Sequence, residues 1–184
     1  MALERKKTLN VFRDARDAWG SYDDFPVGAR GTDPMPYLSR NRVAQPFFLV
    51  SAEDQVIIQM SGKGHIEFRE IDRDRMSLGP GDTVYVPAGV PSRLVPRDEN
   101  IQIRLKADPP GREAVAWYCG RCGALVHARE LGEGVLQEHY WHAVQAFNAD
   151  LAARTCGDCA EVHPPADLGD IAWLDVAAAI RAED

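Results

Sequence analysis

The sequence predicts an all-β barrel or sandwich that carries a metal-binding segment at its C-terminal end. Between Pro46 and Lys106, short β-branched or aromatic segments alternate with Gly, Asp and Pro, a pattern typical of small β-barrels. The Asp-Pro-Pro-Gly sequence at 108–111 cannot continue a strand, and all four cysteines lie within Cys-x-x-Cys pairs beyond it. The strands are expected at 47–50, 56–60, 65–70, 83–86, 92–95 and 101–106.

The 184-residue chain has 45% hydrophobic and 27% charged residues, which is ordinary for a globular protein. A net charge of −7 argues against a nucleic-acid or anionic-membrane partner. No apolar run approaches the ~20 residues of a membrane helix, and the N-terminus does not resemble a secretory signal. Because paired cysteines outside a disulfide framework indicate metal ligation in a reducing compartment, we expect a cytoplasmic location.

Three regions are expected. Residues 1–45 form an arm with an amphipathic helix at 3–19 (core contacts Leu3, Leu9, Phe12 and Trp19), followed by loop. Residues 46–107 form the barrel, with a hairpin turn at 61–64. Residues 108–184 form the metal segment, with helices at 135–153 and 168–180.

The cysteine pairs are Cys119 with Cys122 and Cys156 with Cys159. Two intervening residues let both sulfurs of a pair face one ion, and two pairs complete a tetrahedral site. A four-thiolate site leaves no open position, so it is structural, and the ion is zinc or iron. A redox dithiol is the alternative. The closed metal site is favoured because two pairs occur and nothing else in the chain is thioredoxin-like.

The sequence GDTVYVPAGVPS at 81–92 combines a glycine turn, an alternating strand and a rigid Pro-x-Gly turn. Its order resembles the second motif of the cupins, which implies a double-stranded β-barrel (jelly roll) with flanking helices. In cupins the residue at the end of this motif is usually a metal-binding histidine, and here it is Ser92.

The cysteine segment is more specific. Trp117-Tyr118-Cys119 through His127, followed by the second pair and His163-Pro164, resembles the rubredoxin-like segment of bacterial 3-hydroxyanthranilate 3,4-dioxygenases. The resemblance spans roughly residues 9–165. It implies a catalytic iron(II) held by two histidines and a glutamate, at positions that correspond to Leu49, Gln55 and Ser92. None of these three residues is the histidine or glutamate of the family. We therefore expect no catalytic metal in the barrel, unless Glu53, Asp54 and His65 rebuild a site.

The resemblance also supplies candidates for binding a small aromatic carboxylate. Arg42, with Arg40 as the alternative, corresponds to one substrate arginine, and Arg93 and Arg97 bracket the second. Alternation along 101–106 places Arg104 either in the cavity or on the surface. Ser92, Glu53 and His65 are candidates for polar or proton-transfer roles. The candidates for lining the binding site are Arg42, Val27, Val50, Gln55, Val56 and Ile58.

Three functions remain open. The first is an enzyme that works without catalytic iron on a 3-hydroxyanthranilate-like aromatic amino acid or its ring-opened product, by positioning and acid–base chemistry. The second is a 3-hydroxyanthranilate 3,4-dioxygenase with replaced ligands. The third is a non-catalytic binding or partner protein. The resemblance to cupins also implies a homodimer.

Overall fold

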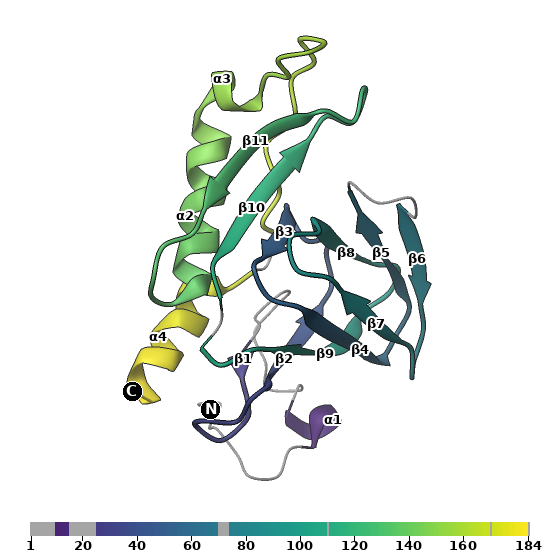
Figure 1. Ribbon diagram of the computed structural model, residues 1–184, viewed down its shortest axis with the longest axis vertical. Helices are drawn as coiled ribbons and strands as arrows, with labels where there is room; N and C mark the ends of the chain where they lie inside the picture. The colour runs from purple at the N-terminus through teal and green to yellow at the C-terminus, as the bar shows by residue number, and fades with distance from the viewer. Residues whose placement is uncertain (1–9, 15–24, 70–73, 110, 170, 184) are drawn as a thin grey trace.

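A computed structural model describes residues 10–14, 25–69, 74–109, 111–169 and 171–183, and these residues form two antiparallel sheets (Figure 1). The first sheet has the order β1 (Phe25–Pro26), β2 (Met35–Asn41), β9 (Asn100–Lys106), β4 (Gln55–Ser61), β7 (Thr83–Val86). The second has the order β11 (Leu125–Glu130), β10 (Glu113–Tyr118), β3 (Phe48–Ser51), β8 (Ser92–Pro96), β5 (Gly64–Phe68), β6 (Arg75–Leu78). The all-β prediction is confirmed.

Strand alternation decides which side chains fill the space between the sheets. In β4 and β7, the buried Ile57, Val84 and Val86 point into the core, and Thr83 and Tyr85 point outward. The second sheet contributes Leu49, Ile66, Phe68, Leu78, Leu94 and Val115 to the same core, and Phe47, just before β3, joins them. Gln55 and Gln59 alternate with Ile57 on the same strand, so they also face inward.

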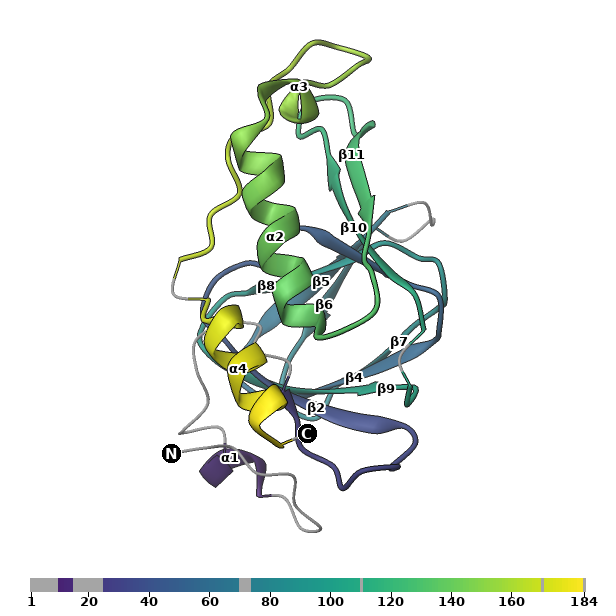
Figure 2. The ribbon, with the colours of Figure 1, turned by 90° about the vertical axis from the view of Figure 1, so that its left-hand side faces the viewer.

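The C-terminal segment shares this core. Strands β10 and β11 continue the second sheet, and α2 (Leu136–Ala149) lies alongside them (Figures 1 and 2). Trp117 of β10 stacks on Phe147 of α2 with ring centroids 4.0 Å apart. Phe47 contacts Trp117, Tyr140 and Trp173, the last from α4 (Trp173–Glu183). The aromatic cluster therefore joins barrel and C-terminal segment in one hydrophobic core.

The expectation of loop before residue 46 is wrong for β2. This strand carries Pro36 and several polar residues, which conceal its pattern, yet it pairs along its whole length with β9. Strands β1, β6, β10 and β11 were also not expected. Because β2 and β10 belong to the two sheets, the sheets extend beyond residues 46–107 on both sides.

The expected hairpin at 61–64 is wrong as well. The turn connects β4 to β5, but these strands belong to different sheets, so the turn crosses from one layer to the other. Gly62 has a positive φ of 67°, and a Cβ there would collide with the Glu99 carbonyl oxygen. Only glycine fits this crossing.

The predicted N-terminal helix falls mostly outside the described residues, which include only α1 (Val11–Asp14). Leu3, Leu9 and Trp19 lie outside them too. Phe12 was expected in the core but is 52% exposed, and Val11 is buried instead. The helix expected at 135–153 breaks at Asp150, whose side chain caps α3 (Leu151–Arg154). None of the described helices has the length and apolar character that a bilayer-spanning helix needs.

Candidate functional site

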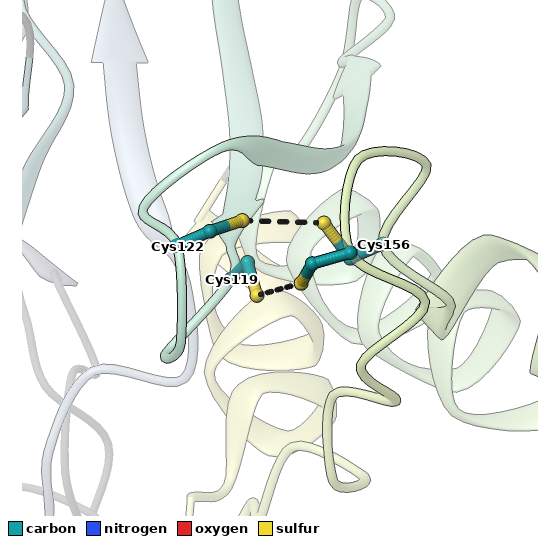
Figure 3. Close-up of side chains that lie close together, drawn as sticks. Cys119, Cys122 and Cys156 are labelled. Atoms are coloured by element: carbon teal, nitrogen blue, oxygen red, sulfur yellow. Dashed lines mark hydrogen bonds between the residues drawn. The ribbon is translucent and has the colours of Figure 1, made fainter.

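The four cysteines come together at the end of the β10–β11 hairpin. In Figure 3 the sulfurs of Cys119, Cys122 and Cys156 point toward one another across two turns. The four Sγ atoms lie within 4.8 Å of one another, and the pairs Cys119–Cys159 and Cys122–Cys156 are each 3.6 Å apart. Four sulfurs around one zinc ion at 2.3 Å would stand about 3.8 Å apart. The donor set therefore fits a tetrahedral ion.

The two turns have the same backbone design. The Gly123 N–H donates to the Cys119 carbonyl at 2.9 Å, and the Ala160 N–H donates to the Cys156 carbonyl at 3.0 Å. Gly123 and Ala160 both have positive φ, 78° and 59°, a conformation that is unusual for alanine. Backbone N–H groups of Cys122 and Arg121 lower the pKa of Cys119 to about 6, which favours its thiolate, whereas desolvation and hydrogen bonds of the neighbouring thiols raise the pKa of Cys122 and Cys159.

Inside the barrel mouth, Glu113 of β10 accepts hydrogen bonds from three elements. Lys106 Nζ of β9 lies 3.1 Å from its Oε1, and both side chains are at most 3% exposed. The Tyr140 hydroxyl of α2 donates to Oε2, and Gln55 Nε2 of β4 approaches Oε1 at 3.5 Å. This acid network (Lys106, Glu113, Tyr140 and Gln55) places an ammonium, a carboxylate and a phenol in a site shielded from water.

Arg104 lies beside the acid network on the inner face of β9. It is 4% exposed, which settles the alternation along 101–106: Gln102, Arg104 and Lys106 point inward. Its strand neighbours are Tyr37 and Ile57, and Lys106 Nζ lies 5.1 Å from the Tyr37 ring centroid. Two cations therefore sit on one buried strand face.

A cavity of about 850 Å³ reaches Glu113 from the side of the β11–α2 connection. Its wall includes Arg112, Glu130, Leu131 and Leu136. A volume of this size accommodates a small ligand. Of the acid network, only Glu113 lines this cavity.

The other end of the barrel interior is closed by amides. Asn41 Nδ2 donates to Asn100 Oδ1 at 3.0 Å and to Gln102 Oε1 at 3.1 Å. Gln102 Nε2 donates to Gln59 Oε1 at 2.6 Å, and Gln59 Nε2 donates to the Ser61 carbonyl at 2.7 Å. This amide network satisfies its own donors and acceptors and presents no ionisable group.

The three positions that the resemblance aligns with iron ligands all belong to this interior. Leu49 of β3 and Ser92 of β8 are direct cross-strand partners, and both are buried. Gln55 is 3% exposed and joins the acid network through Glu113. The structure thus brings an aliphatic, an amide and a hydroxyl side chain into the inner layer.

Other proposed lining residues point elsewhere. Val56 and Ile58 alternate with the inward Gln55 and Ile57, so they lie on the outer face of the first sheet. The expectation that they line a site in the barrel is therefore wrong. Val50 packs against the outer cluster of Phe48, Ala116 and Tyr118. Val27 is buried with Phe25, Leu38 and Val176 in a cluster that also includes Ile101 and Ile103, outward residues of β9.

Several charged candidates lie outside the interior. Arg42 is exposed, and its Nε is 2.7 Å from Glu99 Oε2. Glu53 and Asp54 are exposed, and Asp54 accepts the Ala88 N–H at 2.9 Å. His65 lies on the outer face of β5, between Glu67 at 3.2 Å and Arg75 at 3.0 Å. Arg93 pairs with Glu67 at 2.6 Å on the same face. The structure does not bring these residues together with Ser92 and Arg104.

Sequence reasoning missed Glu113 and Tyr140. Glu113 lies two residues after the Asp-Pro-Pro-Gly sequence and was not assigned to a strand, and Tyr140 falls within the helix expected at 135–153 but was not a candidate site residue. One feature of the sequence could have pointed to them: a tyrosine hydroxyl that is buried usually needs a hydrogen-bond partner, so Tyr140 calls for a polar side chain nearby. Lys106 was placed on the polar face of its strand, but its partner could not be inferred.

Comparison with characterised proteins identifies the family. No protein-family model matches the chain. The 3-hydroxyanthranilate 3,4-dioxygenase of Shewanella woodyi is 34% identical over 149 residues, which cover 79% of this chain and 74% of that relative. The chain belongs to the 3-hydroxyanthranilate 3,4-dioxygenase family. This confirms the family that the cysteine segment indicated.

Other members of the 3-hydroxyanthranilate 3,4-dioxygenase family align over shorter stretches. The Jannaschia relative is 39% identical over 71 residues and the Ruegeria pomeroyi relative 36% identical over 87. These alignments cover only 39% and 48% of the two relatives' lengths, and 38% and 46% of this chain. In these two alignments the chain spans less than half of each relative's length.

Two solved structures are similar at low sequence identity. A cupin-2 domain protein from Shewanella frigidimarina has a TM-score of 0.48 and 19% identity, covering 55% of this chain and 95% of its own. Hydroquinone 1,2-dioxygenase from Sphingomonas sp. TTNP3, solved with 4-hydroxybenzoate bound, has a TM-score of 0.47 and 16% identity, covering 52% and 71%. The homodimer, the aromatic carboxylate partner and the cytoplasmic location stay predictions.

Proposed function

We propose that this member of the dioxygenase family is a cupin enzyme that acts on a 3-hydroxyanthranilate-like aromatic amino acid, or on its ring-opened product, without a catalytic iron in the barrel. The observation that carries the proposal is the buried acid network beside Arg104, whose Glu113 also lines a cavity of about 850 Å³. A relative's name supplies the substrate class.

The donor set argues against iron at the family's position. Leu49 offers no donor atom, and Ser92 offers only a hydroxyl. Gln55 offers a neutral amide whose nitrogen is directed at Glu113. Iron(II) that activates O₂ is typically held by two imidazoles and a carboxylate. Residues of this kind do not fit that ion, so no step of the proposed reaction passes through it.

The acid network can perform proton transfer instead. Lys106 Nζ lies 3.1 Å from Glu113 Oε1 and orients the carboxylate, whose oxygens can accept a proton. The Tyr140 hydroxyl already donates to that carboxylate, so a proton can pass between the two oxygens. Arg104, with its planar fork, is suited to hold the carboxylate of an aromatic amino acid. Ser92 supplies a further hydroxyl in the inner layer.

Binding and turnover of 3-hydroxyanthranilate by protein purified without added iron provide the test. We expect Arg104→Gln to weaken calorimetric binding about tenfold or more, because a charge-assisted pair is lost. We expect Glu113→Gln to keep binding and to abolish turnover, followed by absorbance with and without O₂. Arg97→Gln, an exposed arginine outside the acid network, is the matched control.

Each alternative gives a different result. Turnover that consumes O₂ and requires a second metal equivalent, beyond the cysteine centre, would favour a dioxygenase with replaced ligands and overturn the proposal. Binding without turnover of either 3-hydroxyanthranilate or its ring-opened product would favour a non-catalytic binding protein. Unchanged binding in Arg104→Gln would remove the barrel mouth as the site.

A further inference from the structure

The outer face of the second sheet carries a second cavity that the proposed function does not use. Its volume is about 440 Å³, and it lies between this sheet and the two cysteine turns. The sheet side contributes Phe48, Arg69, Arg93 and Tyr118, and the turns contribute Arg121 and a stretch at 161–164. The lining thus includes three arginines and His163 but a single carboxylate, that of Glu161.

The arginines of this cavity are held against aromatic rings. The guanidinium carbon of Arg69 lies 5.1 Å from the Phe48 ring centroid and 5.5 Å from that of Tyr118. The guanidinium carbon of Arg93 lies 5.0 Å from the Phe48 ring. Stacking of this kind restricts long side chains that would otherwise lose rotamer freedom when a ligand binds. The cations are therefore pre-positioned.

Within the part of the chain that the structure describes, no carboxylate pairs with Arg69. Arg93 is paired with Glu67 at 2.6 Å, and Arg121 lies 3.8 Å from Glu161. No such ion pair involves Arg69 among the residues that the structure describes, and its buried Nε has no hydrogen-bond partner there. Buried polar atoms normally have partners, so an unpaired one at a cavity points to an absent acceptor.

We propose that this outer cavity binds a small aromatic carboxylate. A carboxylate matches the planar fork of arginine, and Pro46, Val162 and Pro164 offer an apolar surface for a ring. The volume lies in the range of small-ligand sites. The outer cavity is separate from the acid network, because Arg69, Arg93 and Phe48 belong to the outer face of the second sheet.

Benzoate is the probe, and the Trp117 indole N–H is the local reporter. Trp117 lines the cavity, and its Nε1 donates to the carbonyl of Pro46, another lining residue, at 2.9 Å. We expect benzoate to shift the indole N–H resonance of Trp117, assigned with Trp117→Phe. Arg69→Gln should weaken this binding about tenfold or more. The surface variant Arg97→Gln should leave it unchanged.

Further variants make the result decisive. Arg104→Gln in the barrel should not change benzoate affinity at Trp117, which separates this site from the proposed function. Val162→Glu places a negative charge at a side chain that is 45% exposed, so it should weaken binding without disturbing the core, even if Arg69→Gln unfolds. Arg69→Lys keeps the charge but loses the fork, and should recover only part of the affinity.

Several outcomes would overturn the proposal. One is the absence of a benzoate-dependent shift at Trp117 in the wild-type chain at millimolar concentration. Another is equal binding of acetate, inorganic phosphate and benzoate, which would indicate a general anion site. Equal losses in Arg69→Gln and Arg97→Gln would indicate only the overall charge of the protein.

Discussion

In the cysteine centre, four cysteines come from two turns of the same backbone design, whereas the acid network is assembled from strands β4, β9 and β10 and from helix α2. Each turn of the centre is complete within about six residues. The acid network depends on strand register and on the docking of a helix. The centre is therefore specified locally, and the barrel interior is specified by the whole fold.

This contrast predicts that the largest single effect comes from the cysteine centre. Replacing Cys119 and Cys156 together by serine removes one ligand from each turn. We expect the metal content to fall from one equivalent to near zero and the protein to lose several kcal/mol of stability, since structural metal binding contributes on the order of 10 kcal/mol in isolated zinc domains.

Elemental analysis and thermal unfolding measure both effects. Glu161→Gln, a half-exposed neighbour of the second turn, is the control and should keep its metal. A full equivalent retained in the double variant would mean that the ion is bound elsewhere, and the contrast between the two regions would be lost.

The acid network should give the next largest effect. Glu113→Ala leaves the ammonium of Lys106 buried without its counter-charge, which typically costs about 3–5 kcal/mol. Glu113→Gln keeps the shape and one hydrogen-bond acceptor, so it should cost less. Urea unfolding measures both. A cost below about 1 kcal/mol for Glu113→Ala would mean that water reaches the network in solution.

The amide network should be less sensitive, because it holds no charge. Gln102→Ala leaves Gln59 and Asn41 each short of one partner, at an expected cost of about 1–3 kcal/mol. Gln145→Ala, an exposed amide on α2, is the control in the same urea titrations. If Gln102→Ala destabilised the protein more than Glu113→Ala, the two ends of the barrel would have to be ranked in the opposite order.

The smallest effect concerns the outer face. Burial raises the pKa of Glu67. The charge and hydrogen bond of Arg93, with a contribution from His65, lower it by more than burial raises it, so the net shift is downward from 4.5. A lowered folded-state pKa contributes stability above the unfolded-state pKa, and this stability is lost as pH falls through the folded-state value.

Glu67→Gln should therefore be less stable than wild type by about 0.5 kcal/mol at pH 7, with the difference shrinking as the pH falls below 4.5, through the lowered folded-state pKa. Urea unfolding between pH 3 and pH 7 measures it. A difference that does not change with pH would show that Glu67 stabilises the face by packing alone.

The elements that sequence reasoning recovered are those with local signals. The turn at Pro87–Gly89 and the strand before it carry their own Gly, Pro and alternation pattern, and β7 spans the four residues that were expected. The cysteine pairs were predicted to converge, and they do. Neither prediction depends on knowing which strands pair or which side chains meet in the folded protein.

The elements that were missed depend on partners. Strand β2 is a strand because β9 offers a matching edge, although its own sequence includes Pro36 and Arg40. Glu113 became a candidate site residue only when Lys106 and Tyr140 were placed beside it. Val56 and Ile58 were named as lining residues together with Gln55, although neighbouring residues of a strand point to opposite faces of the sheet.

The shared aromatic cluster around Phe47 has a consequence for how the protein can be divided. A fragment that ends near residue 108 would lose Trp117, Tyr140 and Trp173, which contact Phe47, and would expose the apolar interior of the second sheet. The C-terminal segment thus covers apolar side chains of the barrel core. We therefore expect the barrel and the C-terminal segment to unfold together, whether unfolding is followed by proteolysis, by denaturant titration or after metal removal with a chelator.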